Sequence, residues 1–381
     1  QPVIILLSQQ KNLMDEPEAR SSHQSKEPTY GGAAMFIVFS ILVLSLTGFV
    51  GFPQEDLNQG MSLIAGISIL FFLGIKDDMV GLAPTKKFLG QLLAACLVIF
   101  IGGMRIESLD GIFGIGQLPY LVSVLFSIFV YMLIVNAYNL IDGIDGLAGV
   151  IALISTFIFG WFFLVDGNTA MAIISFVLIG TVLGFLRFNL SDTRKLFMGD
   201  SGSLFIGFLL AYQAIAFLNA NQVGGSETFV SNAPVIVLTV FSFPLLDTLR
   251  VFALRAMRGK SPFSPDRNHI HHHLLEKGLD HKQATTLIAT KSLLMITVAW
   301  MLQDISIHIH LLAMVALGFV IYLIDLAFRR RIATSTQEIN ELNADEAKRK
   351  LQERRAQTMV RSADQAKKRA ESLRETATTG D

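Results

Sequence analysis

The chain has 381 residues, of which 52% are hydrophobic and only 16% are charged. A soluble globular domain carries about 25% charged residues, so this composition excludes an ordinary soluble enzyme. The net charge at pH 7 is zero, which excludes a generally basic nucleic-acid-binding protein, and a single cysteine, Cys96, excludes an intramolecular disulfide. The sequence therefore indicates a membrane protein that crosses the bilayer several times.

The chain starts with Gln1 and a short apolar run, Val3 to Leu7. The hydrocarbon core of a bilayer is about 30 Å thick and needs about 20 apolar residues in a helix, so this run is too short to cross it. We interpret the run as the stub of a transmembrane helix.

Ten longer apolar runs follow, separated by polar residues, glycine or proline. They cover approximately residues 30 to 50, 59 to 75, 88 to 103, 118 to 138, 147 to 165, 168 to 186, 203 to 219, 233 to 252, 285 to 302 and 309 to 328. Each run is close to the length of one transmembrane helix. The predicted fold class is all-α: a polytopic integral membrane protein with ten complete transmembrane helices and the stub of an eleventh at the N-terminus.

Lysine and arginine fall almost entirely into one of the two sets of alternate loops. That set carries fifteen of them, at Lys11, Arg20, Lys26, Lys76, Lys86, Lys87, Arg187, Arg194, Lys195, Arg255, Arg258, Lys260, Arg267, Lys277 and Lys282. The other set carries Arg105 alone. Because positively charged loops stay in the cytoplasm, the first set is predicted to be cytoplasmic. Residues 1–328 would form the membrane-embedded domain, and residues 329–381 a charged cytoplasmic tail that is helical or disordered.

Polar clusters occur at four places where predicted spans end, and all four fall on the cytoplasmic side. They are Asp77 with Asp78, Asp142 with Asp145, Asp200, and the segment from Ser261 to His273. An unpaired charge is costly to bury in a membrane, so charged residues at this depth indicate a function. The residues alone leave structural alternatives open, because Asp side chains also cap turns and helix N-termini, and glycine-rich segments form turns.

The carboxylates lie beside Asn139 and several glycines. Oxygen ligands of this kind bind a hard divalent cation, typically Mg²⁺, which bridges to substrate phosphates. Arg267 and the neighbouring histidines would supply donors for phosphate oxygens. A structural zinc site is disfavoured because no cysteine accompanies the histidines. Together the clusters predict phosphoryl transfer at the membrane surface.

Five motifs in this order make the sequence resemble the polyprenyl-phosphate N-acetylhexosamine-1-phosphate transferases, and the resemblance covers nearly the whole chain. They are the segment with AspGluProGluAlaArg and ProThrTyrGlyGly, the AspAsp pair, the run AsnAlaTyrAsnLeuIleAspGlyIleAspGlyLeuAla, PheMetGlyAspSerGlySer, and the HisIleHisHisHis loop. The sequence departs from the family at Ser21, where a lysine is common, and in the near absence of the family's first span.

The resemblance implies an all-helical membrane enzyme that transfers a sugar-1-phosphate from a UDP-N-acetylhexosamine to undecaprenyl phosphate and releases UMP, with Mg²⁺ or Mn²⁺ as cofactor. Such an enzyme carries out the first membrane step of cell-envelope polysaccharide synthesis at the bacterial cytoplasmic membrane. Its active site and C-terminus would face the cytoplasm. Its partners are the two substrates and the lipid bilayer, with no nucleic acid, and a homodimer is left open.

The resemblance also implies roles for individual residues. Asp200 would be the principal metal ligand, with Asp142 as a second ligand and catalytic carboxylate. Asp77 would be the base that deprotonates the lipid phosphate, with Asp78 as its partner. The implied substrate contacts are Asn139 in the polar site, Asp145 and Phe197 for uridine, Lys86 or Lys87 for the lipid phosphate, and Arg267, His269, His271 and His272 for the diphosphate or the sugar.

Three questions stay open at this point. The segment SerProPheSerProAspArg followed by HisIleHisHis resembles the branch that uses UDP-GlcNAc, and the peptidoglycan branch, which uses UDP-MurNAc-pentapeptide, ranks second. A cation-coupled transporter is the alternative of another class, although transporters place their coupling residues near the bilayer midplane. Transfer could proceed by direct attack of the lipid phosphate or through a covalent intermediate on Asp77 or Asp78.

Overall fold

The computed structural model describes residues 30–191, 193–222, 229–259 and 268–321. The chain divides into two compact units, residues 1–323 and 324–381, and every described residue belongs to the first unit. The run Val3 to Leu7, residues 329–381 and Arg267 lie outside the described residues.

The described residues are helical almost throughout. In chain order the helices are α2 (Gly31–Val50), α3 (Gln54–Val80), α4 (Pro84–Phe100), the short 3-10 helix η1 (Ile112–Gly114), α5 (Tyr120–Ile141), α6 (Leu147–Asp166), α7 (Thr169–Asn189), α8 (Gly199–Ala220), α9 (Ala233–Val240), α10 (Ser242–Met257), α11 (Ile270–Glu276), α12 (His281–Met301) and a last helix, Ile307–Ile321. Within these ranges the β-structure is a single antiparallel bridge between Ser108 and Gln117. The prediction of an all-α protein is confirmed.

Each predicted span overlaps a helix or a pair of helices. Six helices of the described part, α2, α5, α6, α7, α8 and α12, are each long and apolar enough to cross a membrane, and α9 and α10 qualify together as a bent pair. The protein is therefore a multi-pass membrane protein. Exposed apolar side chains such as Phe49 and Leu121 on the outer helices fit a lipid surrounding.

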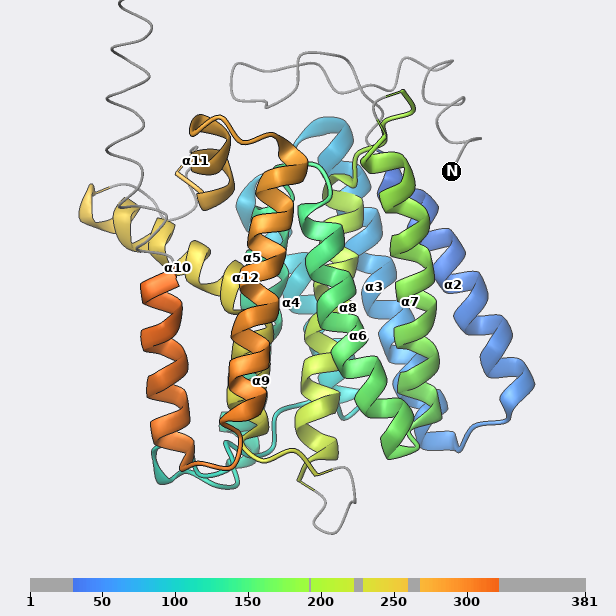
Figure 1. Cartoon of the computed structure of the whole chain (residues 1–381). Helices are drawn as coiled ribbons and strands as arrows, with labels where there is room; N and C mark the ends of the chain where they lie inside the picture. The colour runs from blue at the N-terminus through green and yellow to red at the C-terminus, as the bar shows by residue number, and fades with distance from the viewer. Residues whose placement is uncertain (1–29, 192, 223–228, 260–267, 322–381) are drawn as a thin grey trace, which may run out of the picture. The chain divides into compact units, whose positions relative to one another are not determined.

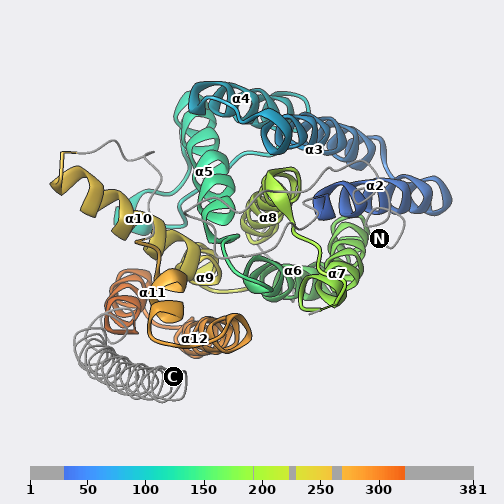
Figure 2. The ribbon, with the colours of Figure 1, turned by 90° about the horizontal axis from the view of Figure 1, so that it is seen from above.

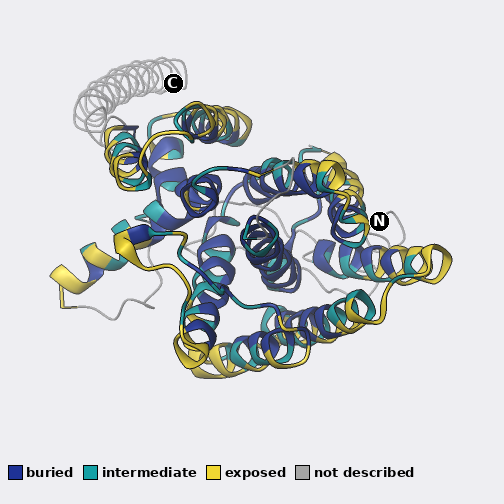
Figure 3. Cartoon of the chain, turned by 90° about the horizontal axis from the view of Figure 1, so that it is seen from below, coloured by how far each residue is buried: buried dark blue, intermediate teal, exposed yellow. Residues whose placement is uncertain are grey.

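Helix α8 lies inside a ring formed by α2 to α7, as the view from above shows (Figure 2). The most apolar window of α8 is 100% buried, whereas that of α2 is only 22% buried. The same contrast is visible in Figure 3, where α8 is buried along its length and α2 exposes one side. Small residues permit this packing, since a Cβ atom added at Gly207 would lie 3.2 Å from the Cβ atom of Tyr138 on α5. The first turn of α8 is thereby held at the centre of one end of the bundle.

The predicted span at residues 233 to 252 is wrong as a continuous helix. Helix α9 ends at Val240, α10 begins at Ser242, and the two are bent by 69° relative to each other. Pro244 gives a physical reason, because it has no N–H group to donate to the carbonyl of Val240 and its ring disfavours a continuing helix. Helix α10 consequently runs sideways from the bundle, near α11 (Figure 1).

Candidate active site

Four helix ends meet where α3 and α5 finish and where α4 and α8 begin. Their polar residues are Asp77 and Asp78 near the end of α3, Lys87 in the first turn of α4, Asn139 and Asp142 at the end of α5, and Asp200 in the first turn of α8. These residues were all predicted as site residues, and the structure brings them together from segments as much as 123 positions apart in the chain. We call this group the acidic cluster.

Asp200 is the centre of the acidic cluster, because the side chains of Lys87 and Asn139 both donate hydrogen bonds to it. Its Oδ2 atom accepts a hydrogen bond of 2.8 Å from Lys87 Nζ, which also forms an ion pair with Asp77. Its Oδ1 atom accepts a hydrogen bond of 2.6 Å from Asn139 Nδ2, and the same amide donates to Ser203 Oγ. Both carboxylate oxygens of Asp200 are thus fixed by donors from other helices.

The adjacent residues Asp77 and Asp78 point to different partners. Asp78 accepts hydrogen bonds from the backbone N–H groups of Asp200, at 2.7 Å, and of Ser201, at 3.1 Å. It therefore caps the N-terminus of α8 from a neighbouring helix, so Asp200 itself is not the cap. Asp77 Oδ1 accepts from the backbone N–H of Leu82 at 2.6 Å, which caps the turn after α3. Both carboxylates therefore cap backbone N–H groups, and Asp77 in addition pairs its charge with Lys87.

Asp142 follows the last residue of α5. Burial, and then the negative charges of Asp200, Asp78 and Asp145, raise the pKa of Asp142 to about 8. The acidic cluster thus brings four carboxyl groups, those of Asp77, Asp78, Asp142 and Asp200, around one ammonium group, that of Lys87. Among the described residues, no group of three or more His, Cys, Asp or Glu side chains is arranged so that it could hold a metal ion.

A second polar group surrounds Asp145 and consists of Lys195 and His281. Its Oδ2 atom lies 2.7 Å from Lys195 Nζ and 2.9 Å from His281 Nδ1, while its Oδ1 atom is buried and has no hydrogen-bond partner among the described residues. Burial alone would raise the pKa of Asp145, but His281 and Lys195 outweigh it and lower the pKa. The Lys195 ammonium also lies 5.6 Å from the centre of the Phe197 ring. The two residues predicted to contact uridine, Asp145 and Phe197, are thus joined through Lys195.

The sequence reasoning did not select Lys195 or His281 as site residues. Lys195 was visible only as one of many loop charges, although it stands two positions before Phe197. His281 begins α12 directly after Asp280, whose side chain forms a capping box with Gln283. The capping pattern could have located this helix start, but nothing in the sequence directs it toward Asp145.

The histidine loop packs against the turn between α5 and α6. A Cβ atom added at Gly143 would overlap the imidazole of His271, so this glycine permits the close approach. Both ring nitrogens of His271 are buried and find no hydrogen-bond partner in the part of the chain that the structure describes, and burial holds the pKa of His271 well below its usual value. The rings of His269 and His272 flank it, with ring centres 5.6 and 4.3 Å away. The three predicted histidines are therefore grouped beside the segment that carries Asp142 and Asp145.

The structure separates the two predicted lysines. Lys87 faces the acidic cluster, whereas Lys86 is exposed. Four residues after Lys87, Gln91 is buried and exchanges hydrogen bonds with Asn136 on α5, so the face that carries both Lys87 and Gln91 is turned inward. Arg267, predicted to contact the diphosphate, lies outside the described residues.

The two glycines of the ProThrTyrGlyGly motif form backbone hydrogen bonds to the segment before α8. Gly31 and Gly32 donate hydrogen bonds of 2.9 Å to the carbonyls of Phe197 and Met198, directly before α8. A side chain at Gly32 would collide with the backbone of Gly202. The glycines therefore allow the start of α2 to hold the segment that carries Phe197 and Asp200.

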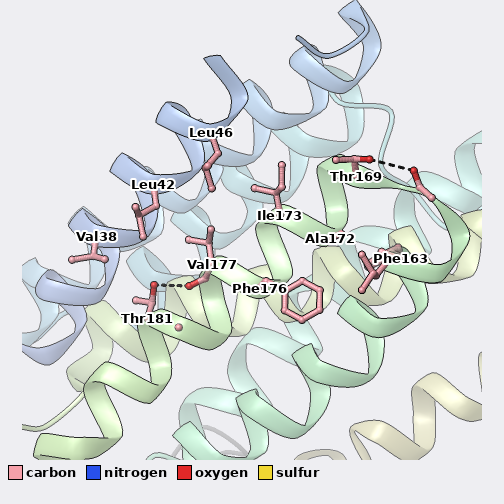
Figure 4. A pocket seen from close by; sticks show the side chains of 13 residues that line it. Val38, Leu42, Leu46, Phe163, Thr169, Ala172, Ile173, Phe176, Val177 and Thr181 are labelled. Atoms are coloured by element: carbon pink, nitrogen blue, oxygen red, sulfur yellow. Dashed lines mark hydrogen bonds between the residues drawn. The ribbon is translucent and has the colours of Figure 1, made fainter. Parts of the chain in front are cut away.

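An apolar groove of about 650 Å³ lies elsewhere, on the outer side of α2 and α7. Val38, Leu42 and Leu46 of α2 face Ile173 and Val177 of α7 across it (Figure 4). It contains none of the predicted site residues, so it is separate from the acidic cluster.

Comparison with known proteins gives one matching family model, glycosyl transferase family 4, over residues 60–218. That stretch contains the whole acidic cluster and Asp145. The chain is 35% identical to the decaprenyl-phosphate N-acetylglucosaminephosphotransferase of Mycolicibacterium smegmatis over 71% of this chain and 71% of that protein. It is 30% identical to the undecaprenyl-phosphate alpha-N-acetylglucosaminyl 1-phosphate transferase of Escherichia coli K12 over 75% of each chain, and 29% identical to the protein of the same name from Yersinia pestis over 81% and 83%.

Proposed function

Because this chain belongs to glycosyl transferase family 4, we propose that it transfers GlcNAc-1-phosphate from UDP-GlcNAc to undecaprenyl phosphate and releases UMP. The observation that carries the proposal is the convergence of the acidic cluster at one end of the bundle, with a histidine group beside it. Carboxylates, an ammonium group and imidazoles are the groups that phosphoryl transfer uses to bind and orient phosphates.

The oxygen donors of the acidic cluster fit Mg²⁺, with Asp200 and Asp142 as the residues that would hold it. The excess of carboxyl groups over ammonium groups in the acidic cluster supports this, since a divalent cation would balance the charge of the carboxylates. Bound Mg²⁺ would supply charge neutralisation at the diphosphate of the donor. Asn139 keeps the Asp200 carboxylate oriented for this task through its 2.6 Å hydrogen bond.

The acceptor would bind at Lys87, whose ammonium is already set between two carboxylates. We assign the lipid phosphate to Lys87 rather than to the exposed Lys86, and the base role to Asp77, the partner of Lys87. An oxygen of the lipid phosphate forms a bond to the β-phosphorus of the UDP-sugar, and the bond to the bridging oxygen breaks so that UMP leaves with that electron pair. Asp78 would contribute by fixing the first turn of α8, and with it Asp200.

The donor would extend from the acidic cluster toward Asp145. Phe197 would stack on the uracil ring, Asp145 would accept from the base, and His269, His271 and His272 would contact the diphosphate or the sugar. The buried Oδ1 atom of Asp145 and the buried nitrogens of His271 support this placement, because a ligand would provide the hydrogen bonds that they lack.

We place the acidic cluster on the cytoplasmic face, in a membrane domain of ten complete spans, because the basic loops lie at the same end of the spans as the cluster. The C-terminal residues 329–381 would follow on the same side.

The test is UMP release by the purified full-length chain in detergent with undecaprenyl phosphate and Mg²⁺. UDP-GlcNAc, UDP-GalNAc and UDP-MurNAc-pentapeptide are compared, each with and without a chelator. We expect chelator-sensitive turnover with UDP-GlcNAc. Turnover with the pentapeptide donor instead would assign the peptidoglycan reaction, and no turnover with any donor from a folded sample would reject sugar-phosphate transfer.

A further inference from the structure

Asp247 on α10 is a fully buried carboxylate that the reaction described above does not use. Its Oδ2 atom lies 2.8 Å from His269 Nδ1. Its Oδ1 atom accepts from the backbone N–H of Ile270 at 3.0 Å and from Arg250 at 3.1 Å. A carboxylate with no exposed surface needs such donors, because burying an unpaired charge is costly. All the donors come from its own helix or from the start of α11.

The bend between α9 and α10 is what brings Asp247 to this position. It turns α10 by 69° away from the axis of α9, and Asp247 lies in the second turn after the bend. The N–H group of Ile270 is the first of α11, so Asp247 caps this short helix from outside it. Arg250 also donates to the carbonyl of Asn268, directly before His269. One buried carboxylate and its arginine therefore fix the backbone on both sides of His269.

The contact with Asp247 also decides which atoms His269 offers to a ligand. With Nδ1 directed at a carboxylate, the ring keeps its proton on Nδ1, and Nε2 is the nitrogen left for a substrate. The ring of His269 is stacked at 5.6 Å on that of His271, which adjoins Gly143 in the candidate site.

We propose that Asp247 is a positioning residue that holds the His269 ring with its Nε2 atom directed at the UDP-sugar. This inference rests on the proposed function, and it assigns His269 to the nucleotide-sugar rather than to the lipid acceptor. Asp247 acts only through His269 and touches no substrate itself.

The experiment is a double-mutant cycle with Asp247→Asn and His269→Ala, measured as UMP release. Asn keeps the size of the side chain and an acceptor for Ile270, but loses the charge. We expect Asp247→Asn to lower kcat/KM for UDP-GlcNAc about 30- to 100-fold, while KM for undecaprenyl phosphate stays within about twofold. In the His269→Ala background the same change should cost less than about threefold, because the two residues act as a unit.

Thr248→Val is the matched control. Thr248 is the next residue on α10 and is buried, and none of the residues that the structure describes forms a hydrogen bond with its hydroxyl. Its loss should leave kcat/KM within about twofold, which separates a specific effect from a general disturbance of α10. Asp247→Glu, which restores the charge, should recover activity relative to Asp247→Asn.

Three results would overturn the proposal. One is an equal loss from Asp247→Asn with and without His269, and another is a change confined to the lipid acceptor. The third is an equal loss in Asp247→Glu and Asp247→Asn together with a lowered melting temperature in both, which would mean that Asp247 serves packing alone. A wild-type chain that turns over no UDP-sugar would reject the proposed function first, and this inference with it.

Discussion

Two polar networks tie α8 to its neighbours, and they are built from different side chains. Inside the bundle, Gln213 of α8 donates to Ser175 of α7 at 3.0 Å and accepts from Thr156 of α6 at 3.2 Å, and all three side chains are fully buried. At the end of the bundle, Asp200 of the same helix is held by Lys87 and Asn139. The inner network uses only neutral groups, whereas the acidic cluster uses charges.

The difference indicates that the inner network holds helices together, whereas the acidic cluster serves the reaction. Neutral hydroxyls and amides are sufficient to join helices in a membrane, where one interhelical hydrogen bond contributes about 0.6 to 2 kcal/mol. Carboxylates and ammonium groups cost more to bury and are kept where a function requires their charge. Substitutions in the acidic cluster should therefore change turnover far more than stability, and substitutions in the inner network should do the reverse.

The largest effect is expected for Asp200→Asn. The change removes the charge proposed to hold the cation but keeps the shape, so turnover should fall by about 1,000-fold or more, with the melting temperature nearly unchanged. The measurement is UMP release together with thermal unfolding in detergent. Turnover within tenfold of wild type would show that Asp200 does not have the role proposed for it.

Lys87→Met should lower turnover by about 100-fold and raise KM for undecaprenyl phosphate, since the ammonium proposed to hold the lipid phosphate is lost. Lys86→Met is the matched control on the adjacent, exposed residue and should stay within about twofold. Equal losses in the two variants would contradict the assignment of the lipid phosphate to Lys87.

Lys195→Met should act on the donor alone. Loss of the ion pair with Asp145 and of the contact with Phe197 should raise KM for UDP-GlcNAc about tenfold with little change in kcat. Steady-state kinetics with each substrate varied in turn checks this. A rise in KM for the lipid instead would place Lys195 on the acceptor side.

The smallest effect on turnover is expected for Gln213→Leu. Removing the amide leaves Ser175 its hydrogen bond to the carbonyl of Met171 but removes the acceptor of Thr156. The free energy of unfolding should therefore fall by about 1 kcal/mol while turnover stays within about twofold. Thermal unfolding and UMP release on the same sample measure both quantities. A large loss of turnover at unchanged stability would contradict the claim that the inner network serves stability and not the reaction.

Much of the fold follows from apolar length alone, because a helix must be about 20 residues long to satisfy its backbone in a bilayer. The run at residues 233 to 252 shows the limit. Its length indicated one span, and the break depends on Pro244, whose missing N–H group matters more than the apolar character around it. Asp247 lay within that predicted span and was not selected, although a carboxylate inside a span is itself a sign of function.

The candidate site was predictable as a set of residues but not as a set of contacts. Asp77 and Asp78 are neighbours in sequence, yet one faces Lys87 and the other caps α8, because successive residues of a helix point in directions about 100° apart. The choice between Lys86 and Lys87 was accessible in principle, since Lys87 and the polar residue Gln91 share one helix face. The meeting of Asp145 with His281 joins residues 136 positions apart, and only the folded chain brings them together.

The enclosure of α8 has a consequence for how the protein is made. A helix with no lipid-facing side must, while alone in the membrane, expose Gln213 and its serines to hydrocarbon, an unfavourable state. Most of the helices that cover it, α2 to α7, precede it in the chain, although α9, which also packs against it, follows. Synthesis from the N-terminus therefore places most of the surrounding helices in the membrane before α8 itself. The order of these segments along the chain thus favours the enclosure of α8, and we expect a circular permutation that moved α8 ahead of α2 to lose that advantage.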